Sequence, residues 1–427
     1  MRRVSGFRYR APARVFDILK TVTIEGFKSI RKQNLELGYL NVFIGANGSG
    51  KTALLEALGV LGAAAAGRVD DAELLRRGVR PGVPRLFKSA FDKSAPNDRL
   101  PRVIKLSGAS PAGARYDVTL DNPKDSAATP WRFSTETLRF REEKLVTRSP
   151  RGANLWKGDK KEPLKLADAY RGIAPVFQTM EVATARVTGM LNRLAEFVIY
   201  DPQTAILRGT MADALPLDPL GLQGGRLAEA VGQLLQPKKG LFGSLPLEDL
   251  FALIDWASDV DVSAPTPDLV SPSIPAAAEI LRFTDKYLRS DLSRLSAYDA
   301  SEGALYVLFA LTLLLHPRTP RLFAVENIDH ALHPRLARAL VRLLGEQALM
   351  ARNHKQVLLT THNPLVLDGL ALNNDRIRLF TVDRTTAGHT VVHRVAYTDA
   401  LEEAQAKGVT LSQMWTRGLL GAVPSIE

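Results

Sequence analysis

Eight residues, Gly45–Thr52 (G-A-N-G-S-G-K-T), constrain the fold of this 427-residue chain more than any other stretch. The apolar run Leu40–Ile44 precedes them, and the spacing of the residues from Thr52 onward is typical of a helix. A strand, a glycine-rich loop and a helix in this order predict an α/β P-loop fold, whose loop N–H groups close around phosphate oxygens. The weaker interpretation is a glycine-rich turn before a surface helix.

The pattern assigns a role to each polar residue of the loop. Gly45, Gly48 and Gly50 let backbone N–H groups approach a phosphate, and Lys51 supplies a positive charge to the β- and γ-phosphates. The Thr52 hydroxyl is a ligand for Mg²⁺. The predicted ligands are therefore a nucleotide and Mg²⁺.

Composition excludes several other classes of protein. The chain is 45% hydrophobic and 24% charged, as in ordinary globular proteins of two or three lobes. Its longest apolar run, Ala304–Leu315, is too short to span a bilayer and predicts a core helix. Met1–Val4 is followed by no apolar core, and there are no cysteines, so we expect a cytoplasmic protein without membrane segments.

Positive charge is concentrated in one quarter of the chain. The formal net charge is +11, and residues 64–165 hold 22 Lys and Arg against 13 Asp and Glu, a surplus of nine. The first twenty residues are also basic. Such a surplus favours contact with nucleic-acid phosphates, and a solvated basic face is an equally weighted alternative.

The middle of the chain predicts strands and then helices. Short alternating runs between 103 and 148 predict an antiparallel meander, and residues 164–194 have a helical pattern. Helices are expected at 226–235 and near 246–258, with a loop at 208–225 and a Pro- and Ser-rich linker at 259–276.

Two buried strands near the carboxyl end supply further candidate site residues. Glu326 follows the apolar run Leu322–Val325, and His362 ends the run Gln356–Thr361. Because ligands bind at the carboxyl ends of parallel strands, we expect Lys51, Glu326 and His362 to meet at one site. Glu326 is predicted to hold the water shell of Mg²⁺, and His362 to contact the γ-phosphate or the attacking water. Taken singly, each residue also fits a structural role.

A third feature is the start of the predicted core helix. Ser301, in D-A-S-E-G, stands at the N-terminus of that helix with Gly303 close by. A small polar residue at a helix N-terminus is a site for an anion, although an ordinary N-cap is the commoner reason for such a residue.

Together these motifs resemble the ABC-type ATPase heads of the RecF, SMC and OLD group. More narrowly, the chain resembles stand-alone bacterial AAA-family ATPases, many of which act in anti-phage defence. The motifs that carry the resemblance are I-E-G-F-K-S-I (24–30), the phosphate loop, E-N-I-D-H-A-L-H-P (326–334), T-T-H-N-P-L-V-L-D (360–368) and L-S-Q-M-W-T-R-G-L-L-G-A-V-P (411–424). From about 80 to 290 the resemblance is thin.

The resemblance implies roles for individual residues. Asn47, Gly48, Ser49, Gly50, Lys51 and Thr52 would bind phosphate and Mg²⁺, with Phe27, Lys28 and Ser29 near the nucleotide and Glu326 as the Walker B acid. Ser301 and Gly303 match the signature motif, which in this class contacts the γ-phosphate of ATP held by a second subunit. Two ATP molecules would then lie in a head-to-tail homodimer, with Asp329 and His330 at its interface.

Departures from the family pattern limit the expected activity. Asn327 stands where a glutamate usually polarises the attacking water, and an amide cannot accept that proton. Either Asp329 or Glu326 substitutes, or hydrolysis is slow and ATP acts mainly as a clamp. No glutamine occurs between Thr52 and Gln178, where the Q-loop glutamine is expected, and S-E-G is shorter than the transporter signature. Both departures argue against a transporter subunit.

The expected organisation is an α/β nucleotide-binding lobe, an antiparallel β meander and a helical signature lobe. The ranges are a basic extension (1–17), the nucleotide-binding lobe (18–66 with 320–398), a basic loop and β insertion (67–163), the helical lobe (164–319) and a helical tail (399–427). The expected function is a slow Mg²⁺-dependent ATPase whose ATP-bound homodimer acts on DNA or switches a separately encoded effector protein. The alternative is a nucleotide-gated scaffold or DNA clamp with negligible hydrolysis.

Overall fold

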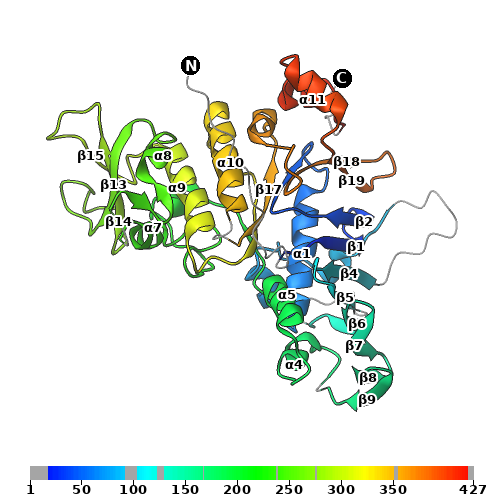
Figure 1. Ribbon diagram of the computed structural model, residues 1–427. Helices are drawn as coiled ribbons and strands as arrows, with labels where there is room; N and C mark the ends of the chain where they lie inside the picture. The colour runs from blue at the N-terminus through cyan, green and yellow to red at the C-terminus, as the bar shows by residue number, and fades with distance from the viewer. Residues whose placement is uncertain are drawn as a thin grey trace.

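Two large β-sheets pack on opposite sides of one central helix, α1 (Lys51–Ala65). The computed structural model describes residues 18–91, 103–122, 129–166, 168–236, 239–274, 277–350 and 354–421. Figure 1 shows α1 at the centre, between the strands of the eight-stranded sheet and the helices of the signature lobe. The predicted 1–17 extension and residues 422–427 of the predicted tail lie outside the described residues.

The nucleotide-binding sheet has six strands in the order β10-β16-β17-β3-β18-β19. The first five run parallel, and β19 pairs antiparallel with β18 at the edge. Nearly all residues of the parallel strands are buried, as expected for a sheet covered on both faces. Their bounds are β10 (Val198–Tyr200), β16 (Leu322–Val325), β17 (Gln356–Thr361), β3 (Leu40–Ile44), β18 (Ile377–Arg384) and β19 (Thr390–Val395).

The second sheet is an antiparallel meander of eight strands in the order β2-β1-β4-β5-β6-β7-β8-β9. Strand β5 alternates buried and more exposed residues, because only one face of this sheet packs on the core. The bounds are β1 (Thr21–Phe27), β2 (Ile30–Glu36), β4 (Val103–Ala109), β5 (Ala114–Asp121), β6 (Arg132–Phe140), β7 (Glu143–Ser149), β8 (Gly152–Lys157) and β9 (Lys160–Leu164).

Side chains of β3 point alternately to the two faces of the nucleotide-binding sheet, and each face packs on a different hydrophobic core. Leu40, Val42 and Ile44 belong to the core shared with the signature lobe, whereas Phe43 belongs to the core around α1. The Phe43 ring stacks on Phe380 of β18 at a centroid distance of 4.9 Å. The sheet is thereby fixed on both faces, and the loops at its carboxyl edge have a rigid base.

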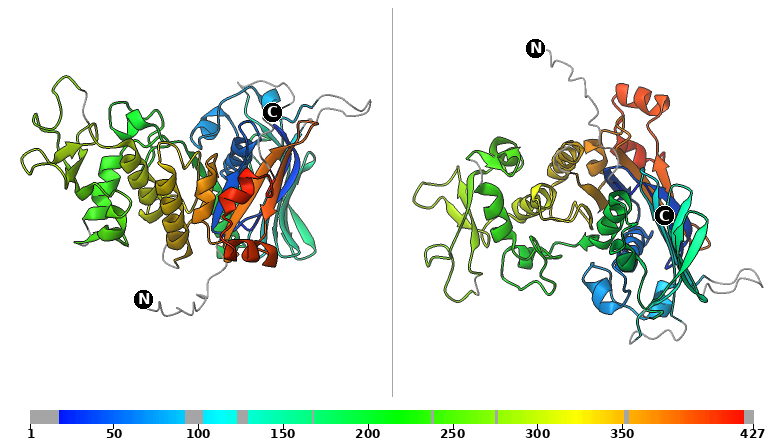
Figure 2. Two further views of the ribbon diagram at one scale, coloured as in Figure 1. Left: turned by 90° about the horizontal axis from the view of Figure 1, so that it is seen from above. Right: turned by 60° about the horizontal axis from the view of Figure 1, so that its bottom comes forward.

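The signature lobe is built on α9 (Glu302–Leu315), which is buried on all sides from Ala304 to Leu315. The predicted core helix is therefore confirmed. Around it lie α6 (Thr204–Leu207), α7 (Leu227–Leu235), α8 (Leu247–Phe251), the hairpin β11 (Leu241–Phe242) with β12 (Leu245–Pro246), and the sheet β13 (Ala257–Ser263), β14 (Ile280–Asp285) and β15 (Arg294–Ser296). In both views of Figure 2 this lobe lies at the end opposite the eight-stranded sheet.

The remaining helices lie outside the signature lobe. They are α2 (Asp71–Leu75), α3 (Pro84–Phe87), α4 (Ala174–Gln178), α5 (Ala185–Ala195), α10 (Pro334–Leu349), the 3₁₀ helix η1 (Pro364–Gly369), α11 (Asp399–Ala406) and α12 (Leu411–Thr416). The C-terminal helix α12 is tied to η1 because Ser412 Oγ donates to Asp368 at 2.7 Å. Within the described residues, every helix is too short or too polar to cross a bilayer.

The fold prediction is confirmed, and several element predictions are corrected. The linker expected at 259–276 is wrong in its first part, because β13 occupies 257–263 and pairs with β14. The helix expected at 246–258 ends at Phe251, and the described residues of the stretch at 164–194 form the helices α4 and α5 with irregular segments between them. The expected meander omitted β8 and β9. Strands β1 and β2, expected in the nucleotide-binding lobe, join the antiparallel sheet, whereas β10 joins the nucleotide-binding sheet.

Candidate nucleotide site

The phosphate loop connects β3 to α1 and places Lys51 as the first residue of the helix. Lys51 Nζ donates to the carbonyl oxygens of Gly45 at 2.8 Å and Ala46 at 3.0 Å, within the loop itself. Burial lowers the pKa of Lys51 to about 8, although the carboxylates of Asp329 and Glu326 oppose this shift. A bound phosphate would favour the charged ammonium and so raise this pKa.

Two loop glycines are required by packing against β18 and β19 as well as by phosphate access. A Cβ at Gly45 would lie 2.0 Å from the Val382 carbonyl oxygen, and one at Gly50 would lie 2.1 Å from Thr390 Oγ1. Gly50 also has a left-handed φ of 111°. Asn47 and Gly48 are exposed at the loop tip, where a ligand can reach them.

Glu326 and Thr52 meet at the carboxyl edge of the nucleotide-binding sheet. The Thr52 hydroxyl donates a hydrogen bond to the Glu326 carboxylate. Burial raises the pKa of Glu326, and the neighbouring Asp201 raises it further, while the hydrogen bond from Thr52 opposes the shift. Because these oxygens already converge, a Mg²⁺ bound to Thr52 would have an acid beside it.

His362 and Asp329 lie beside the lysine on the same edge. His362 Nδ1 is 3.3 Å from Lys51 Nζ, and burial together with the lysine charge lowers the pKa of His362. An imidazole that accepts from an ammonium through Nδ1 keeps its Nε2–H as a donor. Asp329 Oδ1 is buried without a hydrogen-bond partner among the described residues, and so is Ser49 Oγ in the loop. Orphaned polar atoms at this position fit a site whose ligand supplies the missing partners.

Asn327 follows Glu326 in a left-handed conformation, with φ of 50°. Its backbone N–H donates to Thr360 Oγ1 of β17 at 2.9 Å, which fixes the turn after β16. Asn tolerates this conformation better than most residues. His330, expected at the same turn, is exposed, and its ring lies 5.4 Å from the ring of Tyr306 in α9.

A pocket of about 440 Å³ opens next to the phosphate loop. Its walls include Gly48, Gly50 and Thr52. Five cations also line it, namely Lys28, Arg80, Arg85, Lys88 and Arg384. This concentration of positive charge around a phosphate loop suits a triphosphate.

The predicted residues Lys28 and Ser29 are both held beside this pocket. Lys28 and Arg80 form ion pairs with the fully buried Glu56 of α1, with Arg80 Nε at 2.9 Å from the carboxylate. Ser29 Oγ lies 2.7 Å from Thr390 Oγ1, which in turn donates to the Ser49 carbonyl oxygen at 2.8 Å. Thr390 therefore joins the segment around Ser29 to the phosphate loop.

Sequence reasoning missed Thr390, Asp201 and Gln203. Asp201 follows β10, the strand that pairs with β16, and it is close enough to raise the pKa of Glu326. Gln203 Nε2 lies 3.3 Å from the Asp201 carboxylate. The signal was the buried run F-V-I-Y directly before D-P-Q.

The signature residues Ser301 and Gly303 belong to α9 and its N-cap, outside the lining of this pocket. Ser301 is the exposed N-cap of α9, and neither residue is among those that line the pocket at the phosphate loop. The structure thus brings together Lys51, Thr52, Glu326, Asp329 and His362. Gly303 lies beside the turn that follows them, because a Cβ there would be 3.5 Å from the Ala331 carbonyl oxygen.

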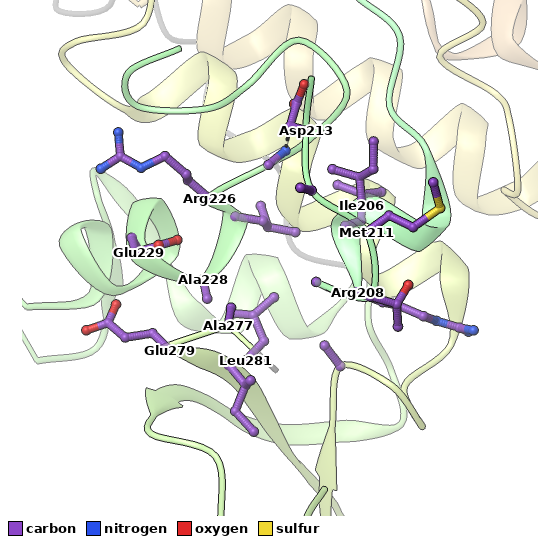
Figure 3. Close-up of a pocket in the computed structure, with 18 of the residues that line it drawn as sticks. Ile206, Arg208, Met211, Asp213, Arg226, Ala228, Glu229, Ala277, Glu279 and Leu281 are labelled. Atoms are coloured by element: carbon purple, nitrogen blue, oxygen red, sulfur yellow. Dashed lines mark hydrogen bonds between the residues drawn. The ribbon is translucent and has the colours of Figure 1, made fainter. Parts of the chain in front are cut away.

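A second pocket, of about 410 Å³, lies in the signature lobe (Figure 3). Residues of the loop after α6, the first turn of α7 and β14 line it, and Ile206, Ala228 and Leu281 make much of its wall apolar. Asp213 stabilises its rim by accepting the N–H groups of Leu215, Gln223 and Gly225 at 3.0–3.1 Å. The pocket contains none of the motif residues.

Comparison with protein families gives two matches, one near the N-terminus and one in the second half of the chain. Residues 21–69 match a family described as "AAA domain", and residues 226–368 match one described as "AAA domain, putative AbiEii toxin, Type IV TA system". A search of curated proteins gives no match.

Solved structures that match this chain include heads of SMC proteins. An SmcHead bound to the C-winged helix domain of ScpA has 13% identity and a TM-score of 0.48, covering 90% of this chain and 99% of that one. The SMC head domain from Thermotoga maritima has 14% identity and a TM-score of 0.40, with 89% and 99% covered. An Smc head domain with an extended coiled coil, bound to the C-terminal domain of ScpA derived from Pyrococcus furiosus, has 12% identity and a TM-score of 0.43, with 91% and 99% covered.

The first family match spans β1, the phosphate loop and α1, and the second spans Ser301, Glu326 and His362. The resemblance seen in the motifs is therefore confirmed. Two stretches of the chain match AAA-domain families, and they lie on an α/β P-loop fold with an antiparallel and a mixed sheet.

Proposed function

We propose that this chain is a slow Mg²⁺-dependent ATPase that assembles as a head-to-tail homodimer around two ATP molecules. One observation carries the proposal: Ser301 is exposed at the N-terminus of α9, where its hydroxyl and the first N–H groups of the helix are open to an anion outside the chain. We assign that anion to the γ-phosphate of ATP bound at Lys51 of a second subunit.

The residues of one chain supply most of the chemistry. Lys51 and the loop N–H groups bind the phosphates, and His362 donates through Nε2 toward the γ-phosphate. Mg²⁺, held by Thr52 and the water shell beside Glu326, would neutralise charge on the phosphates. Asp329 is the group we assign to accept the proton of the attacking water, because its buried Oδ1 lacks a partner among the described residues.

Slow turnover follows from Asn327. An amide at the position next to Glu326 orients water but accepts no proton, and general-base catalysis contributes about 10²–10⁴-fold to rates. The second candidate function, a nucleotide-gated scaffold or DNA clamp with negligible hydrolysis, rests on this same residue.

DNA and an effector protein are the proposed partners. Lys160 and Lys161 on the edge strand β9 are exposed and form no ion pair with any described residue, unlike the paired cations nearer the centre of the sheet. The family match to a toxin of a "Type IV TA system" supports a role in defence.

Complementation between two inactive variants tests the sharing of sites. Lys51→Ala should lose nucleotide binding, and Ser301→Arg should lose the contact in trans. In a mixture, the heterodimer combines ATP held by the Ser301→Arg chain with the intact Ser301 of the other chain. We expect the mixture to recover up to about one quarter of wild-type phosphate release, from one intact site in half of the dimers. No recovery, with both variants folded, contradicts the sandwich.

A further inference from the structure

The signature serine has an unexpected partner in the same lobe. The indole Nε1–H of Trp256 donates to Ser301 Oγ at 3.2 Å. Trp256 lies 45 residues before Ser301, at the end of the segment that leads into β13.

The other hydrogen bond of this hydroxyl oxygen comes from its own helix. Ser301 Oγ accepts the N–H of Ala304 at 3.4 Å, as an N-cap does. A hydroxyl has two acceptor lone pairs and one O–H donor. Both of the contacts that the structure gives to this atom use it as an acceptor, which leaves the proton to donate outward.

Trp256 is itself fixed in position. Its ring packs on Phe283 of β14 with centroids 5.4 Å apart, and its carbonyl oxygen accepts the N–H of Lys286 at 3.1 Å. The β13–β14 pair therefore holds the indole in place before any ligand arrives.

We infer that Trp256 is a positioning residue that orients Ser301 Oγ as a hydrogen-bond donor toward an anion outside the chain. Given the proposed dimer, that anion is the γ-phosphate of ATP held by the second subunit. A donor that already has the bound orientation contributes more to the free energy of binding than a donor that must first reorient. The reorientation then takes no free energy from binding. The inference rests on the proposed function, and it adds the three-stranded sheet to the machinery that recognises ATP.

A double-mutant cycle separates this role from simple support of the lobe. Trp256→Phe keeps the ring packing and removes the N–H, and Ser301→Ala removes the hydroxyl. We expect Trp256→Phe to raise the ATP-dependent dimer dissociation constant at least about tenfold, since in each of two symmetric sites Ser301 Oγ must then reorient before it donates to the phosphate. In the Ser301→Ala background the same substitution should change it less than about twofold.

Trp156→Phe is the matched control. Trp156 Nε1 makes a comparable hydrogen bond to Thr147 Oγ1 at 2.8 Å, in β8 of the antiparallel sheet. This variant should dimerise as the wild type does.

The outcomes distinguish the inference from the proposed function. If Trp256→Phe weakens the dimer equally with and without the Ser301 hydroxyl, or not at all, the positioning role is overturned while the sandwich stands. If the wild type fails to dimerise with ATP, or Ser301→Ala dimerises as tightly as the wild type, the sandwich itself fails and the inference fails with it.

Discussion

Asn327 decides how fast this site can turn over. Asn327→Glu should raise the rate of phosphate release at least about tenfold, because it places a proton acceptor next to Glu326 in addition to Asp329. The substitution should also lower stability by about 1 kcal/mol, since glutamate must adopt the left-handed φ of 50°. Phosphate release at saturating ATP and thermal unfolding measure the two effects. Asn327→Gln is the control for side-chain length, and equal rates in both variants would contradict the assignment.

Lys51 should make proton uptake on nucleotide binding depend on pH. Its pKa of about 8 in the free protein lies below that of an ordinary lysine, and phosphate contact should raise it. Near pH 8.5, binding should therefore take up roughly 0.7 proton, and at pH 7 very little. Titration calorimetry in buffers of different ionisation enthalpy measures this uptake. Lys51→Arg, which stays charged, should show none, and a wild type without buffer dependence at pH 8.5 would refute the account.

Much of the site could be predicted from the residues and their order in the sequence. The other site residues could not, because their roles depend on contacts made only in the folded chain. Lys51, Glu326 and His362 follow buried strands, so their meeting could be predicted from pattern alone. Thr390 and Trp256 act through partners that lie far away in the sequence, and no local periodicity marks them. Asp201 follows a strand of only three residues, which is too short for its pattern to be recognised.

At the scale of elements, α9 depends on a buried histidine at its C-terminus. His316 is 2% exposed, its Nε2 contacts Gln233 Oε1 at 2.9 Å, and its Nδ1 accepts the N–H of Arg318 at 3.2 Å. This arrangement requires the neutral ring, and burial lowers the pKa of His316 to about 4.

The folded protein should therefore lose stability as the pH falls from about 6.5 to 4, because the unfolded histidine binds a proton that the folded one excludes. The loss attributable to this residue is at most about 3 kcal/mol. Denaturant unfolding at several pH values measures it, and His316→Asn should flatten this part of the profile. The exposed His393→Asn is the control, and parallel profiles for wild type and His316→Asn would exclude the proposed cause.

Elements with strong local patterns were predicted well, and those that depend on distant pairing were not. The core helix α9 and the strands β4–β7 have clear periodicity. In contrast, β13 lies in a stretch rich in Pro and Ser, and its partner β14 begins 17 residues after it ends. Edge strand β9 contains Pro163, which weakens a strand pattern but is tolerated at an edge.

At the scale of the whole molecule, charge predicts where DNA would bind. Lys160→Glu with Lys161→Glu should weaken binding to duplex DNA at least about tenfold at low salt and reduce the salt dependence. Lys286→Glu with Arg289→Glu makes the same change in net charge on the hairpin between β14 and β15, in the other lobe. Fluorescence anisotropy of labelled duplex DNA across a salt series compares the affinities of the two double variants and the wild type. Equal weakening by both pairs, or no binding by the wild type at low salt, would exclude β9 as the contact.

The central claim is that ATP joins two copies of this chain through Ser301. Its most direct test is mass by light scattering with and without ATP and Mg²⁺, on wild type and Ser301→Arg, with phosphate release measured in parallel. We predict a dimer that requires ATP, is lost in Ser301→Arg and releases phosphate slowly. A mass that responds to neither nucleotide nor Ser301→Arg would contradict the assignment of the signature motif and the dimer built on it.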